Sequence, residues 1–320
     1  MPRFKYYIKW QVRSVHPLIL VVISVAVIFA LHNVTFWTIW ADAFKGAEIR
    51  GVIFAVALLL LCCGLVSIFA MKRILQPFIA FLFILSSVTS YYMDQLGVII
   101  DREMIQNVVT TTLMEGKHLV TRSFLIWVGV SGILPSILVF YFKIDHPKFF
   151  YSILQNIAFF MLCLLGTILL VATDIKGNSS VLRLRIDLKS SFQPLAPITE
   201  SFLYLAMITR SATLKFQENG SDTTLISNFK KQEKPILTVV VVGETARSQS
   251  FSLGNYSRPT NPKLANEDIV YYDNVSSCGT STAVSLPCMF SKFERSNYSY
   301  EKGTSQENVL DVIQRAGYHV

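Results

Sequence analysis

Two groups of oxygen-bearing side chains in the last third of the sequence could support chemistry. The first is Glu244, which follows the apolar run 236–242 and one glycine. A carboxylate at the end of a buried run is costly unless a charge or a metal ion neutralises it, and Zn²⁺ accepts Asp and Glu oxygens. The same carboxylate could instead cap a helix that opens at Thr245. The position of Glu244 fits both interpretations.

The second group is the hydroxyl run Thr280, Ser281 and Thr282, which lies between Cys278 and Cys288. A hydroxyl becomes a nucleophile near neutral pH when a base or a metal ion activates it. A helix that starts here would also present N–H groups to a phosphoryl group. The alternative is an ordinary helix cap and turn. The spacing does not say which hydroxyl would react.

The elements that must position these groups form an α/β pattern in residues 235–320. The β-branched run 236–242 is typical of a strand buried on both faces, and residues 269–272 predict another strand. A helix is expected at residues 305–315, with Ser305 as its N-cap and Gly317 just beyond its end. Residues 318–320 would begin a further strand, so we expect the sheet to be incomplete within this chain.

The N-terminal half predicts a membrane anchor. Of the 320 residues, 52% are hydrophobic and 16% are charged, whereas about 25% are charged in an average soluble domain. The mean hydropathy is +0.45. A membrane-spanning helix needs roughly 20 apolar residues. Five stretches meet this need and make residues 1–173 a five-span domain: residues 17–39, 52–71, 77–96, 123–142 and 149–173.

The charge distribution predicts the orientation of these spans. With the N-terminus in the cytoplasm, the inside segments carry eight basic side chains and the single acidic Asp145. The outside carries five basic and six acidic ones, counting Asp94 at the outer end of its span. Basic residues favour the cytoplasmic side, so residues after 173 are expected outside the cytoplasm. A basic excess in the apolar half also argues against a nucleic-acid partner. Disulfides persist outside the cytoplasm, so Cys278 and Cys288 are expected to pair, with a free or metal-bound pair as the alternative.

Two polar segments connect these parts. Residues 101–118 are predicted to form one helix at the membrane surface, with Asn107, Thr111 and Glu115 on a shared face because they recur every fourth residue. That face is either simply solvated or functional. Residues 174–234 are predicted to be a linker, interrupted by an amphipathic interfacial helix that starts near Pro197.

Long motifs in this sequence resemble those of the phosphoethanolamine transferases that modify lipid A. These enzymes include the mobile colistin-resistance enzymes and belong to the alkaline-phosphatase-like superfamily. The resemblance covers essentially the whole chain, including the five-span half. It is carried by Val-Val-Gly-Glu-Thr-Ala-Arg at 241–247 and Ser-Cys-Gly-Thr-Ser-Thr-Ala-Val-Ser-Leu-Pro-Cys-Met-Phe-Ser at 277–291, and by residues 255–260 and 306–311.

The resemblance implies a membrane-bound transferase of the bacterial inner membrane with a periplasmic catalytic domain. Thr282 matches the family's nucleophile, which carries a phosphoethanolamine ester, and Glu244 matches a zinc ligand beside it. Phosphatidylethanolamine is the implied donor and lipid A the implied acceptor, and the modification confers polymyxin resistance. The remaining matches are the substrate-binding positions Asn107, Thr111 and Glu115 and the disulfide Cys278–Cys288.

The sequence departs from the family at its remaining zinc ligands, an Asp-His pair and another histidine. After residue 173 the only histidine is His319, which matches none of them. Glu244 and Thr282 are too few for a site that needs four donors, or three and water. We therefore expect this chain to be the N-terminal part of such an enzyme and inactive alone. The alternatives are a phosphoglycerol transferase or sulfatase-like hydrolase of the same superfamily, or a non-enzymatic lipid-binding membrane protein.

Overall fold

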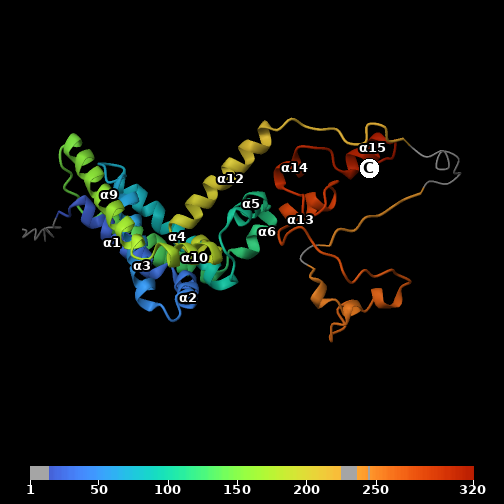
Figure 1. Cartoon of the computed structure of the whole chain (residues 1–320), viewed down its shortest axis with the longest axis horizontal. Coiled ribbons are helices and arrows are strands. Elements are labelled where there is room, and N and C mark those ends of the chain that lie inside the picture. Colours follow the sequence, from blue (N-terminus) through green and yellow to red (C-terminus); the bar gives the residue numbers. More distant parts are fainter. Residues whose placement is uncertain (1–13, 225–235, 244–245) are drawn as a thin grey trace, which may run out of the picture. The chain divides into compact units, whose positions relative to one another are not determined.

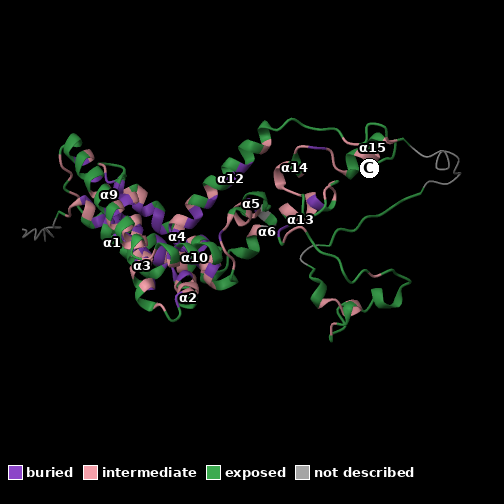
Figure 2. Cartoon of the chain, viewed as in Figure 1, coloured by how far each residue is buried: buried purple, intermediate pink, exposed green. Residues whose placement is uncertain are grey.

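The protein divides into two compact units, Met1–Tyr204 and Leu205–Val320 (Figure 1). The computed structural model describes residues 14–224, 236–243 and 246–320, without the side chains of Leu113 and Glu115. The first unit is helical and contains most of the buried residues (Figure 2). The second unit consists of short helices joined by extended segments.

The first unit confirms a membrane-like helical region. Within its described residues, four stretches are long and apolar enough to cross a membrane, or five if one bent helix pair counts as a span. Many of their apolar side chains face outward, as lipid contact requires. Three of the four are the helices α3 (Glu48–Ser67), α4 (Leu75–Leu96) and α9 (Phe149–Ala172). The fourth, Arg122–Tyr141, is continuous and consists of α7 (Arg122–Trp127), the π-helix η2 (Val128–Ile133) and α8 (Leu134–Tyr141).

The stretch predicted as a span over residues 17–39 is a bent pair of helices. Two helices, α1 (Pro17–Leu31) and α2 (Val34–Ala43), meet there at a bend of 73°. The buried Asn33 lies at the break, and its amide Nδ2 donates to the carbonyl oxygen of Ile28 at 3.1 Å. A polar side chain that bonds the backbone in this way competes with helix continuation.

Asn33 also ties this bend to a distant segment. Its Nδ2 donates to the carbonyl oxygen of Gln193 at 3.2 Å, and its Oδ1 accepts from the Gln193 backbone N–H at 2.8 Å. The Gln193 side chain accepts from Thr89 Oγ1 of α4 at 2.8 Å. All three contacts involve a Gln193 that is only 1% exposed. Gln193 therefore joins α4 to the bend between α1 and α2.

Small residues allow close packing between the spans. A side chain added at Gly132 of η2 would lie 2.9 Å from Ser87 Cβ of α4, and one at Gly64 of α3 would lie 3.0 Å from Cys163 Cβ of α9. Ser87 also shares a hydrogen bond of 2.8 Å with Ser131. Small side chains and interhelical hydroxyl bonds are the usual means of helix association in membranes.

The segment predicted as the first part of a linker, residues 174–196, packs into the first unit instead. It forms α10 (Ile175–Leu184) and α11 (Ile186–Ser191), and Leu188 and Phe192 are buried in the core. Arg185 joins this segment to Asp42 through an ion pair of 2.6 Å. The helix predicted from Pro197 is present as α12 (Leu195–Thr213).

The predicted strands 236–242 and 269–272 are absent from the part of the chain that the structure describes. Leu237 and Val241 are 86% and 85% exposed. A strand exists only where a neighbour completes its hydrogen bonds, and the described residues of this unit offer just an isolated bridge between Gln217 and Gln306. The β-branched sequence alone cannot make the sheet.

The described residues of the second unit also form six short helices. The expected helix 305–315 begins later, as α15 at Val309, and its N-cap is Asn308 rather than Ser305, because Asn308 and Asp311 form a reciprocal capping box. Gly317 lies just past its end with φ +101°, as predicted. The helices are η4 (Ser248–Ser250), η5 (Ser252–Gly254), η6 (Leu264–Asn266), α13 (Thr282–Met289), α14 (Tyr300–Thr304) and α15 (Val309–Arg315).

Replacing Asn33 tests its role in the first unit. We expect Asn33→Ala to lower the free energy of unfolding by about 1–3 kcal/mol, because it leaves the buried Gln193 N–H without its partner. Thermal unfolding of the detergent-solubilised protein measures the loss. The control is Thr38→Ala, at an exposed position on α2 whose hydroxyl bonds only its own helix. Equal stability of the two variants would contradict the assigned role.

Candidate functional site

The three hydroxyls that the sequence left open differ in burial and in their position on the helix. Ser281 is the N-cap of α13 and is 8% exposed, with an Oγ that has no hydrogen-bond partner in the structure. Thr280 and Thr282 are both exposed. Of these two, Thr282 is the first residue of α13, where the helix dipole favours negative charge. The position of Thr282 is thus compatible with a negatively charged phosphoryl group.

A disulfide between Cys278 and Cys288 closes the loop that carries Thr282, as predicted. The two Cα atoms are 6.3 Å apart, and Cys288 is buried at the far end of α13. Gly279 is required for this closure, because a Cβ there would lie 2.9 Å from Val284 Cγ1. Ser277 Oγ donates to the Gly279 carbonyl oxygen at 2.7 Å. Covalent and local contacts thus fix the turn before Thr282.

A second polar cluster supports this unit, and the sequence analysis did not find it. Asn219 donates its backbone N–H to Glu307 Oε2 at 2.9 Å and its Nδ2 to the Glu307 carbonyl oxygen at 2.7 Å, while its Oδ1 accepts from Lys292 Nζ at 2.7 Å. Arg315 pairs with Glu307 and lowers the pKa of that carboxyl. The contacts of the Glu307 carboxylate with Arg315 and with the Asn219 N–H are therefore present at neutral pH. They are lost as the pH falls through the lowered pKa of Glu307.

Glu244 and its proposed contact with Thr282 lie outside the described residues. Among the residues that the structure does describe, no three His, Cys, Asp or Glu side chains converge on a point where a metal ion could bind. Thr282 alone supplies one oxygen donor, and a zinc site needs at least three protein ligands. The described residues do not by themselves fit a zinc site.

The shared helical face predicted for Asn107, Thr111 and Glu115 is wrong. Helix α5 (Arg102–Thr110) ends before Thr111, whose ψ of 131° is extended, and a short α6 (Leu113–Gly116) and η1 (Lys117–Leu119) follow. Asn107 and Thr111 still lie together, because Thr111 Oγ1 donates to the Asn107 carbonyl oxygen at 2.6 Å. The backbone N–H of Thr111 donates to the same carbonyl oxygen at 2.8 Å. Glu115 lies in α6.

Comparison with known proteins relates both units to one group of enzymes. A family model described as phosphoethanolamine transferase EptA/EptB matches residues 57–207, and one described as sulfatase matches residues 237–320. Phosphatidylethanolamine transferase Mcr-1 of Escherichia coli is 31% identical over 325 residues, which cover 97% of this chain and 58% of that protein. Phosphoethanolamine transferase EptA of Escherichia coli K12 is 35% identical over 249 residues, covering 77% of this chain and 45% of that protein.

A solved structure is similar to this chain over nearly its whole length. The integral membrane lipooligosaccharide phosphoethanolamine transferase A of Neisseria meningitidis matches with a TM-score of 0.83 at 25% identity, over 95% of this chain and 57% of that one. The chain belongs to the phosphoethanolamine transferase family. It spans about half the length of the curated relatives it matches. As a family member, it combines a helical membrane region with the first part of a sulfatase-like domain.

Removing the disulfide tests whether it holds the turn before Thr282. The double variant Cys278→Ser/Cys288→Ser frees an 11-residue loop, which chain-entropy arguments value at about 3 kcal/mol. We expect faster proteolytic cleavage within residues 278–291, measured by mass spectrometry of limited digests. A reductant should speed cleavage of the wild type in the same way and should not change cleavage of the variant. If neither the variant nor the reduced wild type is cleaved faster, packing alone fixes the turn.

Proposed function

We propose that this protein transfers phosphoethanolamine from phosphatidylethanolamine to lipid A in the bacterial inner membrane, with the N-terminus cytoplasmic and the second unit periplasmic. The observation that carries the proposal is the exposed Thr282 at the start of α13, in a loop closed by a disulfide. The family supports the reaction type. The basic flanks of the spans support the orientation.

The proposed reaction has two steps, transfer of phosphoethanolamine to Thr282 and transfer from Thr282 to lipid A. Thr282 Oγ forms a bond to the phosphorus of phosphatidylethanolamine, the bond from phosphorus to the glycerol oxygen breaks, and the diacylglycerol leaves with the proton lost by Thr282. A lipid A phosphate oxygen then attacks the same phosphorus, and the Thr282 Oγ–P bond breaks as the hydroxyl regains a proton. Splitting the transfer through a covalent intermediate lets one site meet two bulky lipids in succession.

The start of α13 favours both steps through electrostatics. Negative charge grows on the phosphoryl oxygens in each transition state, and N–H groups at a helix N-terminus stabilise such charge. Asn107 and Thr111 are proposed to bind the phosphoethanolamine group together with Glu115. The transferred group carries an ammonium, which offsets negative charge on lipid A and thereby weakens the binding of cationic polymyxins.

Substitution of Thr282 tests the function. In the full gene product, Thr282→Ala should lower lipid A modification by about a thousandfold or more, because no other group replaces a lost nucleophile. Thr282→Ser should retain measurable transfer. The readout is the mass of lipid A from cells that express each variant. Thr280→Ala, at the other exposed hydroxyl, is the matched control and should stay near wild type.

Other products would point to other reactions. Transfer of glycerol phosphate, or release of free ethanolamine phosphate without lipid A modification, would favour the phosphoglycerol transferase or hydrolase of the same superfamily, and the sulfatase match at residues 237–320 makes hydrolysis the relevant comparison. Full lipid A modification by Thr282→Ala would refute the proposed nucleophile.

Zinc is proposed as the cofactor, with Glu244 and Thr282 as two of its ligands. When bound, zinc lowers the pKa of a coordinated hydroxyl and offsets phosphoryl charge. We expect Glu244→Gln in the full gene product to lower the zinc bound per chain toward background, measured by elemental mass spectrometry. Glu267→Gln, at an exposed position, should not change it. Equal zinc content in both variants would show that Glu244 is not a zinc ligand.

A further inference from the structure

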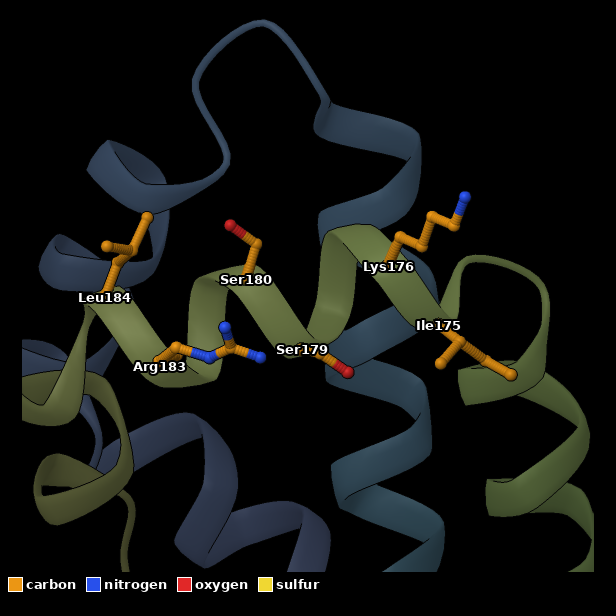
Figure 3. Close-up of a pocket in the computed structure, with 6 residues that line it drawn as sticks. All are labelled: Ile175, Lys176, Ser179, Ser180, Arg183 and Leu184. Atoms are coloured by element: carbon orange, nitrogen blue, oxygen red, sulfur yellow. The ribbon is translucent and has the colours of Figure 1, made fainter.

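Helix α10 lies where the chain leaves the membrane. The span α9 ends at Ala172 and α10 begins at Ile175, so only Thr173 and Asp174 separate them. This short link keeps the start of α10 within about 10 Å of the end of the span, so α10 begins at the membrane boundary if α9 crosses the hydrocarbon layer. Asp174 fixes the start of α10, because its Oδ1 accepts from the Gly177 N–H at 2.9 Å. Figure 3 shows that α10 runs across the neighbouring helices rather than along them.

The two faces of α10 differ sharply. Asn178 and Val181 are buried, and Asn178 Nδ2 donates to the Val171 carbonyl oxygen of α9 at 3.2 Å. The opposite face carries two neighbouring rows of side chains that line a shallow hollow of about 380 Å³ (Figure 3). One row is Ile175, Ser179 and Arg183, and the other is Lys176, Ser180 and Leu184.

Each row combines a basic, a hydroxyl and an apolar side chain. The two serines lie at the centre, and the Arg183 guanidinium extends along the helix toward Ser179 (Figure 3). Lys176 points outward on a flexible four-carbon stem. Ile175 and Leu184 are 60% and 76% exposed. Apolar side chains beside basic ones are typical of helices that rest in the headgroup region of a bilayer.

The two basic side chains of this face carry uncompensated charge. Within the described residues, neither Lys176 nor Arg183 makes an ion pair or a side-chain hydrogen bond, and three nearby carboxylates are already occupied. Asp174 binds Arg50 at 3.1 Å, while Asp42 and Asp187 both bind Arg185.

Two of these carboxylates, Asp174 and Asp187, stay ionised and paired with arginine. The Gly177 N–H and Arg50 lower the pKa of Asp174, and Arg185 lowers the pKa of Asp187. The lowered pKa values keep both groups charged at neutral pH, in contact with Arg50 and Arg185 rather than with the α10 face. An external anion is therefore the available counterion for Lys176 and Arg183.

We propose that this face of α10 binds the phosphate group of an anionic membrane lipid. The guanidinium of Arg183 matches phosphate geometry through paired N–H donors, and Lys176 adds a second positive charge. Ser179 and Ser180 supply hydroxyl donors between them. Ile175 and Leu184 contact the apolar part of the same lipid, which a free phosphate ion lacks. The proposal does not rest on the transfer reaction.

The test measures lipid retention by the intact membrane protein. The protein in detergent is titrated with phosphatidylglycerol or with phosphatidylcholine, and native mass spectrometry gives the affinity for each. Each basic residue near an anionic headgroup contributes about fivefold in affinity. We expect Lys176→Gln/Arg183→Gln to weaken phosphatidylglycerol binding by roughly twentyfold and to leave phosphatidylcholine binding unchanged.

The matched control removes two charges from exposed positions elsewhere in the same unit, Lys45→Gln/Lys189→Gln. It should retain selectivity for phosphatidylglycerol within about twofold. This change is smaller than the roughly fivefold loss expected for removing even one basic residue that contacts the lipid. Unchanged selectivity in the Lys176/Arg183 variant, or equal loss in the control, would overturn the proposal.

Two further results separate a lipid from a free anion. Ile175→Ser/Leu184→Ser should also weaken phosphatidylglycerol binding, because the apolar contact is lost. Inorganic phosphate at the lipid's concentration should not displace it. Displacement by phosphate would mean that the hollow binds a soluble ion, and the lipid assignment would be wrong. Unfolding temperatures of all variants show whether the fold is retained.

Discussion

The structure of the first unit follows from the absence of water in the hydrocarbon layer of a membrane, where every backbone N–H and C=O must find a partner within the protein. Continuous helices meet this demand along α3, α4 and α9. The bend between α1 and α2 does not, and the amide of Asn33 supplies the missing bonds. Because Asn33 bonds Gln193, the chain after α9 must return to the spans to complete them.

That return explains why residues 174–196 were predicted incorrectly. Their polar, mixed-charge composition is typical of a linker. Their structure depends on contacts with residues far away in the sequence, such as Arg185 with Asp42 and Gln193 with Asn33. The spans were predictable because hydrophobic length is a local property. The bend at Asn33 was not, because the contacts that hold it include Gln193, which is 160 residues away in the sequence.

The second unit shows the same distinction. The Cys278–Cys288 disulfide and the approximate position of the last helix were predicted from nearby residues, and both are present. The run 236–242 has a strand sequence, but a strand also needs neighbours, and its side chains are exposed in the structure. The helix cap at Asn308 was missed because Ser305 is an equally good cap in isolation. Only the reciprocal bond with Asp311 decides between them.

Sequence reasoning identified the hydroxyl run and could not choose within it. The structure turns Ser281 inward and leaves Thr282 exposed on the first turn of α13, which agrees with the residue that the family motif indicates. The central claim is that this hydroxyl carries phosphoethanolamine. Mass spectrometry of peptides covering residues 278–291, from protein isolated out of cells with phosphatidylethanolamine membranes, tests it directly. The account predicts a phosphoethanolamine ester on Thr282. An ester on Thr280 or Ser285 instead would contradict it.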